Sequence, residues 1–146
     1  MDTTANIKDI YGLLQLEFDY LDRQVGSRRK RRLAINELPQ LARDLYLVFD
    51  IVGITCGSGT GAWIHYHHDE PGWMVCAEEA FANIGHPVVS DGIRTCLAVY
   101  LSKRETMSLK DDKVPSNYIM DHEHGIMRSL HTYLLKSNYV FHHAVD

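Results

Sequence analysis

The chain has 146 residues, of which 45% are hydrophobic and 23% are charged, a composition typical of a soluble globular domain. Its length predicts one domain, 1–146, which can bury about two-thirds of its extended surface without disulfide or metal staples. No run of about 18 apolar residues is present, so we expect no membrane span. Residues 1–4 lack the basic-then-apolar plan of a signal peptide, and we therefore expect a cytoplasmic protein.

The cysteines give no sign of a disulfide framework or a metal site. Cys56, Cys76 and Cys96 are odd in number, widely spaced and without a Cys-x-x-Cys pair. We expect three reduced, buried thiols. The spacing gives no positive support to a zinc site.

Apolar residues at three- and four-residue steps predict a first helix over residues 4–25, with Thr3 or Thr4 as its cap and Gly26 at its end. A second helix should start near Asn36, with Pro39 in its first turn. Gly53 and the stretch 57–61 should stop it, and a short helical turn is expected over 63–68.

The remaining pattern is also helical. We expect helices over 73–84, 90–104 and 116–137, the last capped by Ser116 and weakened at its centre by Gly125. Residues 105–115 read as a charged surface loop, and residues 139–141 as a short extended tail that packs back. The predicted fold is all-α, a single compact bundle of five to six helices.

The stretch 57–69 combines a glycine-rich turn with three imidazoles, a tyrosine and a tryptophan. On a helix, His65, His68 and Asp69 would share one face, and with residues 122–124 they could form a metal site. A metal-dependent hydrolase is therefore one alternative function. No His-Glu-x-x-His pattern supports it, and a catalytic metal needs at least three converging ligands. We expect no bound metal.

The glycines at 57, 59 and 61 also resemble a phosphate cradle. Such a loop follows a strand and often ends in Gly-Lys-Ser/Thr. Here a helix precedes it and no lysine follows, so we expect no nucleotide and no other cofactor. The stretch is interpreted as a tight joint between helices.

A basic knot and an acidic group supply the strongest charges in a chain of net charge −4. The knot, Arg28, Arg29, Lys30, Arg31 and Arg32, is a candidate contact for nucleic acid or for an acidic partner. It lacks interleaved aromatic residues and a following helix-turn-helix, so a nucleic-acid binder is kept as a further alternative. The acidic group contains Asp69, Glu70, Glu78 and Glu79, which could steer a basic protein surface.

Four segments occur in the order and spacing of a known pattern. Residues 61–63 read Gly-Ala-Trp, 65–69 read His-Tyr-His-His-Asp, 82–87 read Ala-Asn-Ile-Gly-His-Pro, and 130–141 run from Leu-His-Thr-Tyr to Tyr-Val-Phe. In this order the chain resembles a divergent member of a small all-helical bacterial family of unknown function that includes DNA mimic protein nineteen. The resemblance covers about 41–141, leaving 1–35 as an N-terminal helix plus a basic loop.

The departures from that family concern its binding features. An Asn-Asn pair is replaced by Gly59-Thr60, two phenylalanines become His67 and His68, and the net charge is only −4. DNA mimicry therefore does not transfer on physical grounds. The resemblance implies a non-catalytic module that binds another protein, as an inhibitor, an immunity-type factor or a DNA-mimic-like regulator.

No serine, cysteine or carboxylate has a sequence neighbour that marks a catalytic pair, so we expect no enzyme activity. Two-fold homodimers are the commonest oligomers of soluble proteins, so a homodimer is also considered for this chain. The predicted partner-binding residues are Gly59, Gly61, Trp63, His65, Tyr66, His67, His68, Asp69, Glu70, Glu78 and Glu79.

Overall fold

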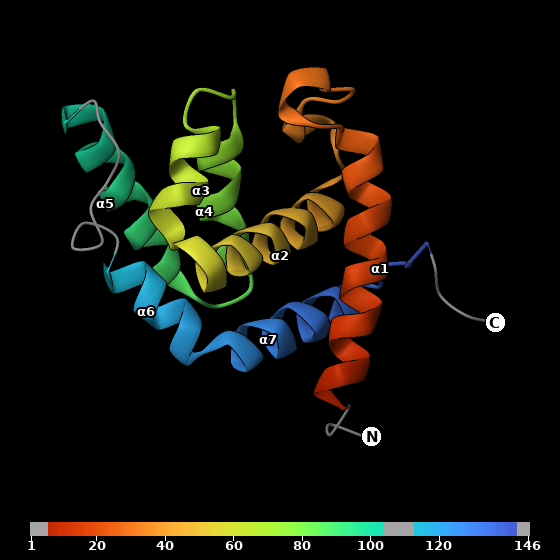
Figure 1. Cartoon of the computed structure of the whole chain (residues 1–146). Coiled ribbons are helices and arrows are strands. Elements are labelled where there is room, and N and C mark those ends of the chain that lie inside the picture. Colours follow the sequence, from red (N-terminus) through yellow and green to blue (C-terminus); the bar gives the residue numbers. More distant parts are fainter. Residues whose placement is uncertain (1–5, 104–112, 143–146) are drawn as a thin grey trace.

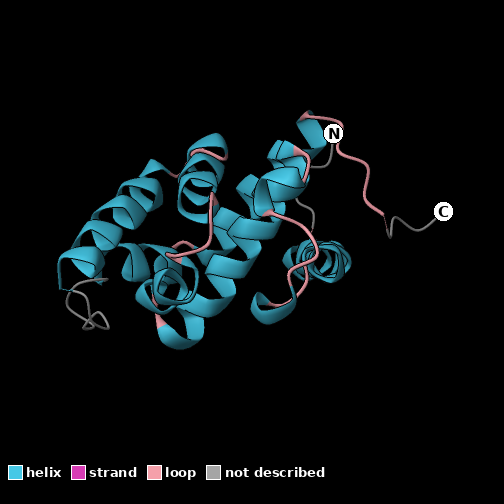
Figure 2. Ribbon diagram, turned by 90° about the horizontal axis from the view of Figure 1, so that it is seen from above, coloured by secondary structure: helices cyan, strands magenta, loops and turns pink. Residues whose placement is uncertain are grey.

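The computed structural model describes residues 6–103 and 113–142, and that part of the chain contains helices and loops but no strand (Figure 2). The seven α-helices of this part are α1 (Ile7–Val25), α2 (Gln40–Ser58), α3 (Thr60–His67), α4 (Trp73–Asn83), α5 (Pro87–Lys103), α6 (Lys113–Asp121) and α7 (Glu123–Lys136). Two short 3₁₀ turns, Arg28–Lys30 and Ile35–Glu37, lie between α1 and α2. The all-α prediction is confirmed, whereas the predicted count of five to six helices is wrong.

The count differs because the last predicted helix is two helices, α6 and α7, which meet at His122. His122 has φ −119° and ψ 19°, outside helical geometry. Its ring Nδ1 lies 2.9 Å from the carbonyl oxygen of Tyr118, which also accepts the His122 backbone N–H. A side chain that competes for a backbone carbonyl favours a break in the helix. Gly125, the expected weak point, lies within α7, and Ser116, the expected cap, lies within α6.

The ends of α1 follow simple backbone rules. Asn6 caps its start, accepting the N–H of Lys8 at 2.8 Å, in place of Thr3 or Thr4, which lie outside the described residues. Gly26 ends the helix as predicted, with φ 81°. A Cβ at Gly26 would collide with the carbonyl oxygen of Lys30, so the turn into the basic loop requires glycine.

The start of α2 differs from the prediction, and its end falls within the predicted stretch 57–61 but not at Gly53. The helix begins at Gln40 rather than near Asn36, because a residue before proline avoids helical geometry, and Leu38 has φ −70° and ψ 140°. It also continues through Gly53 to Ser58, and the turn falls at Gly59, with φ 89°. A mid-helix glycine costs only about 1 kcal/mol, which the burial of this helix outweighs.

The core is organised around α2, which packs against α1, α3, α4, α6 and α7. In Figure 1, α2 crosses the middle of the molecule, with α1 on one side and α5 on the other. Residues 45–48 of α2 are four consecutive buried positions, as in a helix covered all round. Outside α2, the side chains with no exposed surface include Leu14, Trp63, Phe81, Ile93, Ile119 and Ile126.

The C-terminal tail packs back as predicted, onto a buried carboxylate of α1. Glu17 is fully buried and accepts the hydroxyl of Tyr139 and, at 2.8 Å, the backbone N–H of His142. Phe141 is also buried, and its ring lies edge-on to that of Tyr139. Of the predicted loop 105–115, residues 105–112 lie outside the described residues, and residues 113–115 open α6.

The cysteines only partly match the prediction. All three are free thiols, and Cys76 and Cys96 are buried, but Cys56 is exposed on α2. Its sulfur lies 3.4 Å from Oε1 of Glu123. Although the residue as a whole is exposed, partial burial of its thiol and this carboxylate raise the pKa of Cys56, which opposes thiolate reactivity.

Candidate functional site

The glycine-rich stretch forms the joint between α2 and α3. At this joint the hydroxyls of Thr55 and Thr60 lie 3.0 Å apart, and the Thr60 N–H donates to Oγ of Ser116 at 3.0 Å. Trp63 and Ile64 are then fully buried. The joint is thus occupied by internal contacts, in agreement with the interpretation as a helix-to-helix turn.

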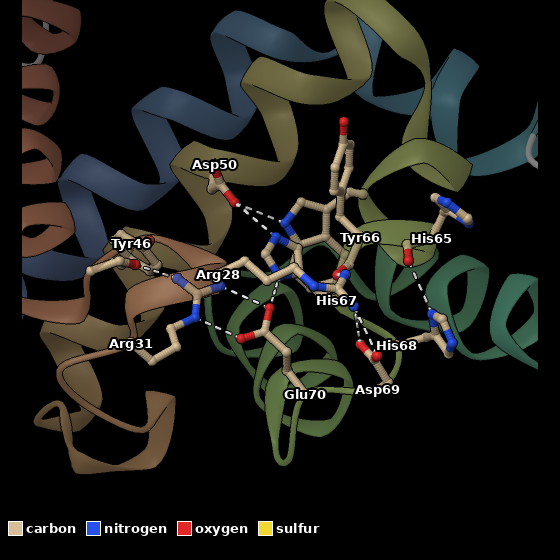
Figure 3. A network of polar contacts seen from close by, with 12 residues as sticks. Arg28, Arg31, Tyr46, Asp50, His65, Tyr66, His67, His68, Asp69 and Glu70 are labelled. Carbon is tan, nitrogen blue, oxygen red and sulfur yellow. Dashed lines mark hydrogen bonds and ion pairs between the residues drawn. The ribbon is translucent and has the colours of Figure 1, made fainter.

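A stacked and ion-paired cluster forms where α3 turns into α4 (Figure 3). We call Arg31, Asp50, His67, Glu70 and Trp73 the Glu70 cluster. The ring of His67 stacks on Trp73 with centroids 4.1 Å apart, and its Nδ1 lies 2.7 Å from Oε1 of Glu70. Arg31 binds Glu70 through two nitrogens, at 2.6 and 2.8 Å, and its guanidinium lies 4.6 Å from the Trp73 ring centroid. An ion pair, hydrogen bonds and ring stacking therefore all fix the position of the segment between α3 and α4.

Burial sets the protonation of this cluster. Burial lowers the pKa of His67 despite the nearby Glu70, which favours the neutral imidazole. Burial would raise the pKa of Glu70, but hydrogen bonds from Arg31 and His67 hold it below its usual value. Burial raises the pKa of Asp50 to about 6, although the indole N–H of Trp63 donates to it at 2.9 Å.

The basic knot is docked onto α3. Arg28 binds both carboxylate oxygens of Asp69, at 3.0 and 2.8 Å, and also donates to the carbonyl oxygen of Tyr66. A cation near the last carbonyls of a helix is favourable. Two of the five predicted contact cations, Arg28 and Arg31, are therefore paired within the chain, while Arg29, Lys30 and Arg32 are exposed.

The predicted partner-binding residues fall into three groups by exposure. The exposed ones are His65, Tyr66, Asp69 and Glu79; Gly59, His67, His68, Glu70 and Glu78 are partly buried; Gly61 and Trp63 are buried. The two buried residues shape the segment from inside. The expected acidic strip is also interrupted, because Oε1 of Glu78 pairs with Arg94 at 2.9 Å.

The residues considered for a metal site do not converge. His65 Nδ1 lies 2.9 Å from the hydroxyl of Tyr100, and His68 Nδ1 lies 3.0 Å from the carbonyl oxygen of His65. Asp69 is taken by Arg28. Over residues 6–103 and 113–142, no group of three or more His, Cys, Asp or Glu side chains is placed to hold an ion.

The structure also forms a constellation that sequence reasoning missed, around His86. Its Nε2 lies 3.0 Å from Oγ of Ser129, and its Nδ1 lies 2.8 Å from the hydroxyl of Tyr118. Burial, helped by His122, lowers the pKa of His86. A serine, a base and an orienting hydroxyl resemble a nucleophile arrangement. Ser129, however, lies inside α7, where backbone N–H groups bond within the helix and cannot form an oxyanion hole.

Comparison with known proteins adds no relative: no family model, no curated protein and no solved structure matches the chain. Within the described part of the chain, every helix is too short or too polar to cross a membrane.

Proposed function

We propose that this chain is a non-catalytic module that binds another protein through an exposed surface around Tyr66. This Tyr66 surface consists of Arg28, His65, Tyr66, His68 and Asp69. The observation that carries the proposal is that Tyr66 is 56% exposed on a segment held in place by its neighbours. Figure 3 shows its ring extending away from the carboxylates of Asp69 and Glu70.

The composition of the Tyr66 surface favours recognition. Tyrosine and arginine are enriched among residues that dominate binding energy at protein interfaces. The exposed ring of His65 lies next to Tyr66, with centroids 6.1 Å apart, which adds aromatic area to this surface. A large side chain with a polar tip gives contact area at low entropic cost.

The Tyr66 surface is also pre-organised. The Glu70 cluster lies beneath it, and Arg28 holds both the Tyr66 carbonyl and the Asp69 carboxylate. A surface that is ordered before binding loses less entropy when the partner arrives. This supports a docking role for the segment.

The charge of the Tyr66 surface argues against the DNA-mimic-like regulator among the three expected modes of action. It contains the cation Arg28 and borders Arg29 and Lys30, so it presents no row of negative charge that could imitate DNA phosphates. We infer an inhibitor or immunity-type factor that recognises a protein surface by shape and mixed charge. A second copy of the chain, giving a homodimer, is one form that the partner can take.

The test replaces Tyr66 with a photo-crosslinking phenylalanine analogue in the native host. The same analogue at Leu135, which is 54% exposed on α7, is the matched control. We expect one protein to be captured from position 66 and not from position 135. With that partner purified, Tyr66→Ala should weaken binding by about 30-fold or more, as expected of a dominant interface residue.

Capture from both positions, or a partner whose affinity is unchanged by Tyr66→Ala, would overturn the proposal. Elemental analysis of the purified protein separates it from the hydrolase alternative. A stoichiometric transition metal would make a metal-dependent hydrolase that uses His65, His68 and Asp69 the preferred function.

A further inference from the structure

The fold divides the cations around the basic knot into matched and unmatched ones. Two arginines of the knot are bound to carboxylates of the segment between α3 and α4. Lys30 and Arg32 are exposed instead, and so is Arg23 in the last turn of α1. Within the described residues, the charged groups of these three side chains make no hydrogen bond or ion pair. Their charge is therefore left for a group outside the chain.

Backbone hydrogen bonds bring these three cations to one place at the end of α1. The chain turns back after the helix, and the N–H of Arg32 donates to the carbonyl oxygen of Val25 at 2.8 Å. Within the turn, the N–H of Lys30 donates to the carbonyl oxygen of Ser27 at 2.9 Å. The result is an open hollow, which we call the basic hollow, lined by Asp22, Arg23, Gly26, Ser27, Lys30 and Arg32.

The basic hollow keeps an excess of positive charge. Asp22 is the one carboxylate in its described lining, and Oδ1 of Asp22 already accepts the hydroxyl of Tyr46 at 2.7 Å. Three cations against one carboxylate leave two positive charges unbalanced. At exposed positions such charges attract an oppositely charged partner over a distance, although salt screens them.

The basic hollow is continuous with the Tyr66 surface. Ser27 lines the hollow, and the next residue, Arg28, donates to the carbonyl oxygen of Tyr66 and binds Asp69. A standard protein interface covers about 800 Å² on each partner. An interface centred on Tyr66 therefore extends over the hollow.

Two features favour a protein over nucleic acid as the source of the opposite charge. Residues 23–32, which carry the cations, include no aromatic side chain on which a base could stack. Asp22 and Asp69 lie beside the cations, and they would repel a continuous row of phosphates. A folded protein can instead place single carboxylates opposite single cations.

We propose that the partner of the Tyr66 surface presents an acidic patch of Asp or Glu side chains to Arg23, Lys30 and Arg32. This inference rests on the proposed function and names the chemistry of that partner. The acidic patch speeds association, because opposite charges steer the two proteins together. Tyr66 holds the complex once it has formed.

The test repeats the photo-crosslinking from position 66 in the native host with two double variants of equal net charge. Lys30→Gln with Arg32→Gln neutralises the hollow, and we expect it to lower the captured yield by about fivefold or more. The matched control is Lys8→Gln with Lys136→Gln, at exposed lysines of α1 and α7, which should change the yield by less than about twofold. Far-ultraviolet circular dichroism confirms that both variants are folded.

A decaglutamate peptide supplies the acidic chemistry without the rest of the partner. In anisotropy titrations at low salt, the hollow variant should bind the labelled peptide about fivefold more weakly than the wild type and the control variant do. The difference should disappear at high salt. A single-stranded oligonucleotide of the same net charge is the second probe, and it should bind more weakly than the peptide.

The outcomes separate this inference from the proposed function. Capture that is undiminished by Lys30→Gln with Arg32→Gln overturns the acidic patch and leaves the Tyr66 surface standing, whereas no capture from position 66 overturns both. Equal losses from the two double variants, or equal peptide binding by the hollow variant and the wild type, also overturn the patch. If the oligonucleotide binds more tightly than the peptide and loses affinity in the hollow variant, the hollow belongs to nucleic acid and the acidic-protein assignment fails.

Discussion

The Glu70 cluster and the Tyr66 surface each contain an arginine paired with a carboxylate, but the surroundings of the two pairs differ. At the Glu70 cluster, Arg31 is matched by a carboxylate at 2.6 Å and covered by Trp73. At the Tyr66 surface, Arg28 is matched by Asp69 at 2.8 Å, but the two side chains are 44% and 52% exposed.

This difference distinguishes charged groups that stabilise the fold from charged groups that can bind a partner. A cation that is already matched inside the chain stabilises the fold and has little left to offer a ligand. The exposed pair of Arg28 and Asp69 contributes less to stability, because water screens it, and both groups can contact a partner. The basic knot, which as a sequence suggested binding, is therefore partly a structural device.

The largest effect is expected from removing the indole on which the Glu70 cluster rests. Trp63 is fully buried, 4.9 Å from the His67 ring, and it donates to Asp50. Trp63→Ala should lower the free energy of unfolding by about 3–5 kcal/mol, because it leaves a cavity in the core. Urea unfolding of the wild type and of Trp63→Ala measures this difference in the free energy of unfolding.

Tyr66→Ala, in the same helix, is the control for that change. Its side chain is mostly exposed, and the expected change is within about 0.5 kcal/mol. Equal losses from the two substitutions would show that Tyr66 is a structural residue and would weaken its assignment to a docking surface.

A smaller loss is expected from breaking the ion pair at the centre of the cluster. The side chains of Arg31 and Glu70 are 23% and 13% exposed, so Glu70→Gln leaves a poorly solvated cation and should cost about 2–3 kcal/mol at pH 7. Asp69→Asn breaks the exposed Arg28 pair, with side chains 44% and 52% exposed, and should cost less than about 1 kcal/mol.

The pH dependence of Glu70→Gln has a defined sign. Because the pKa of Glu70 is lowered in the folded state, its stabilisation is present above the ordinary value of 4.5 and is lost as the pH falls through the folded value. The gap in unfolding free energy between wild type and Glu70→Gln should therefore close in acid. A gap that widens below pH 4 would contradict the assigned pairing.

The helices could be predicted from the sequence to the extent that local rules decide them. The spacing of apolar residues located α1, and Gly26 marked its end. The break at His122 and the passage of α2 through Gly53 were missed. The first depends on where one imidazole bonds, and the second on how many neighbours cover the helix.

The candidate sites were less predictable, because their partners are far apart in the chain. Arg31 and Glu70 are 39 residues apart, His86 and Ser129 are 43 apart, and Asp44 and Tyr133 are 89 apart. The His-rich segment was found because its unusual residues are consecutive.

Asp50 gives an effect of opposite sign to Glu70. Its pKa is raised to about 6 from 3.8, so folding favours the protonated form, and stability is lost as the pH rises from 3.8 through 6. Asp50→Asn keeps an oxygen acceptor for Trp63 and removes the buried charge. With the side chain 23% exposed, we expect a gain of about 1–2 kcal/mol at pH 8 and none near pH 3. Urea unfolding at the two pH values checks it, and a loss at pH 8 would show that Asp50 is ionised at little cost.

The smallest effect is expected at the end of α7. Lys136 is the exposed last residue of α7, where a cation interacts favourably with the helix dipole. Lys136→Gln should therefore cost less than about 0.5 kcal/mol in urea unfolding at low salt, and the cost should fall as salt screens the dipole. A loss as large as that of Glu70→Gln would mean that Lys136 is matched inside the chain.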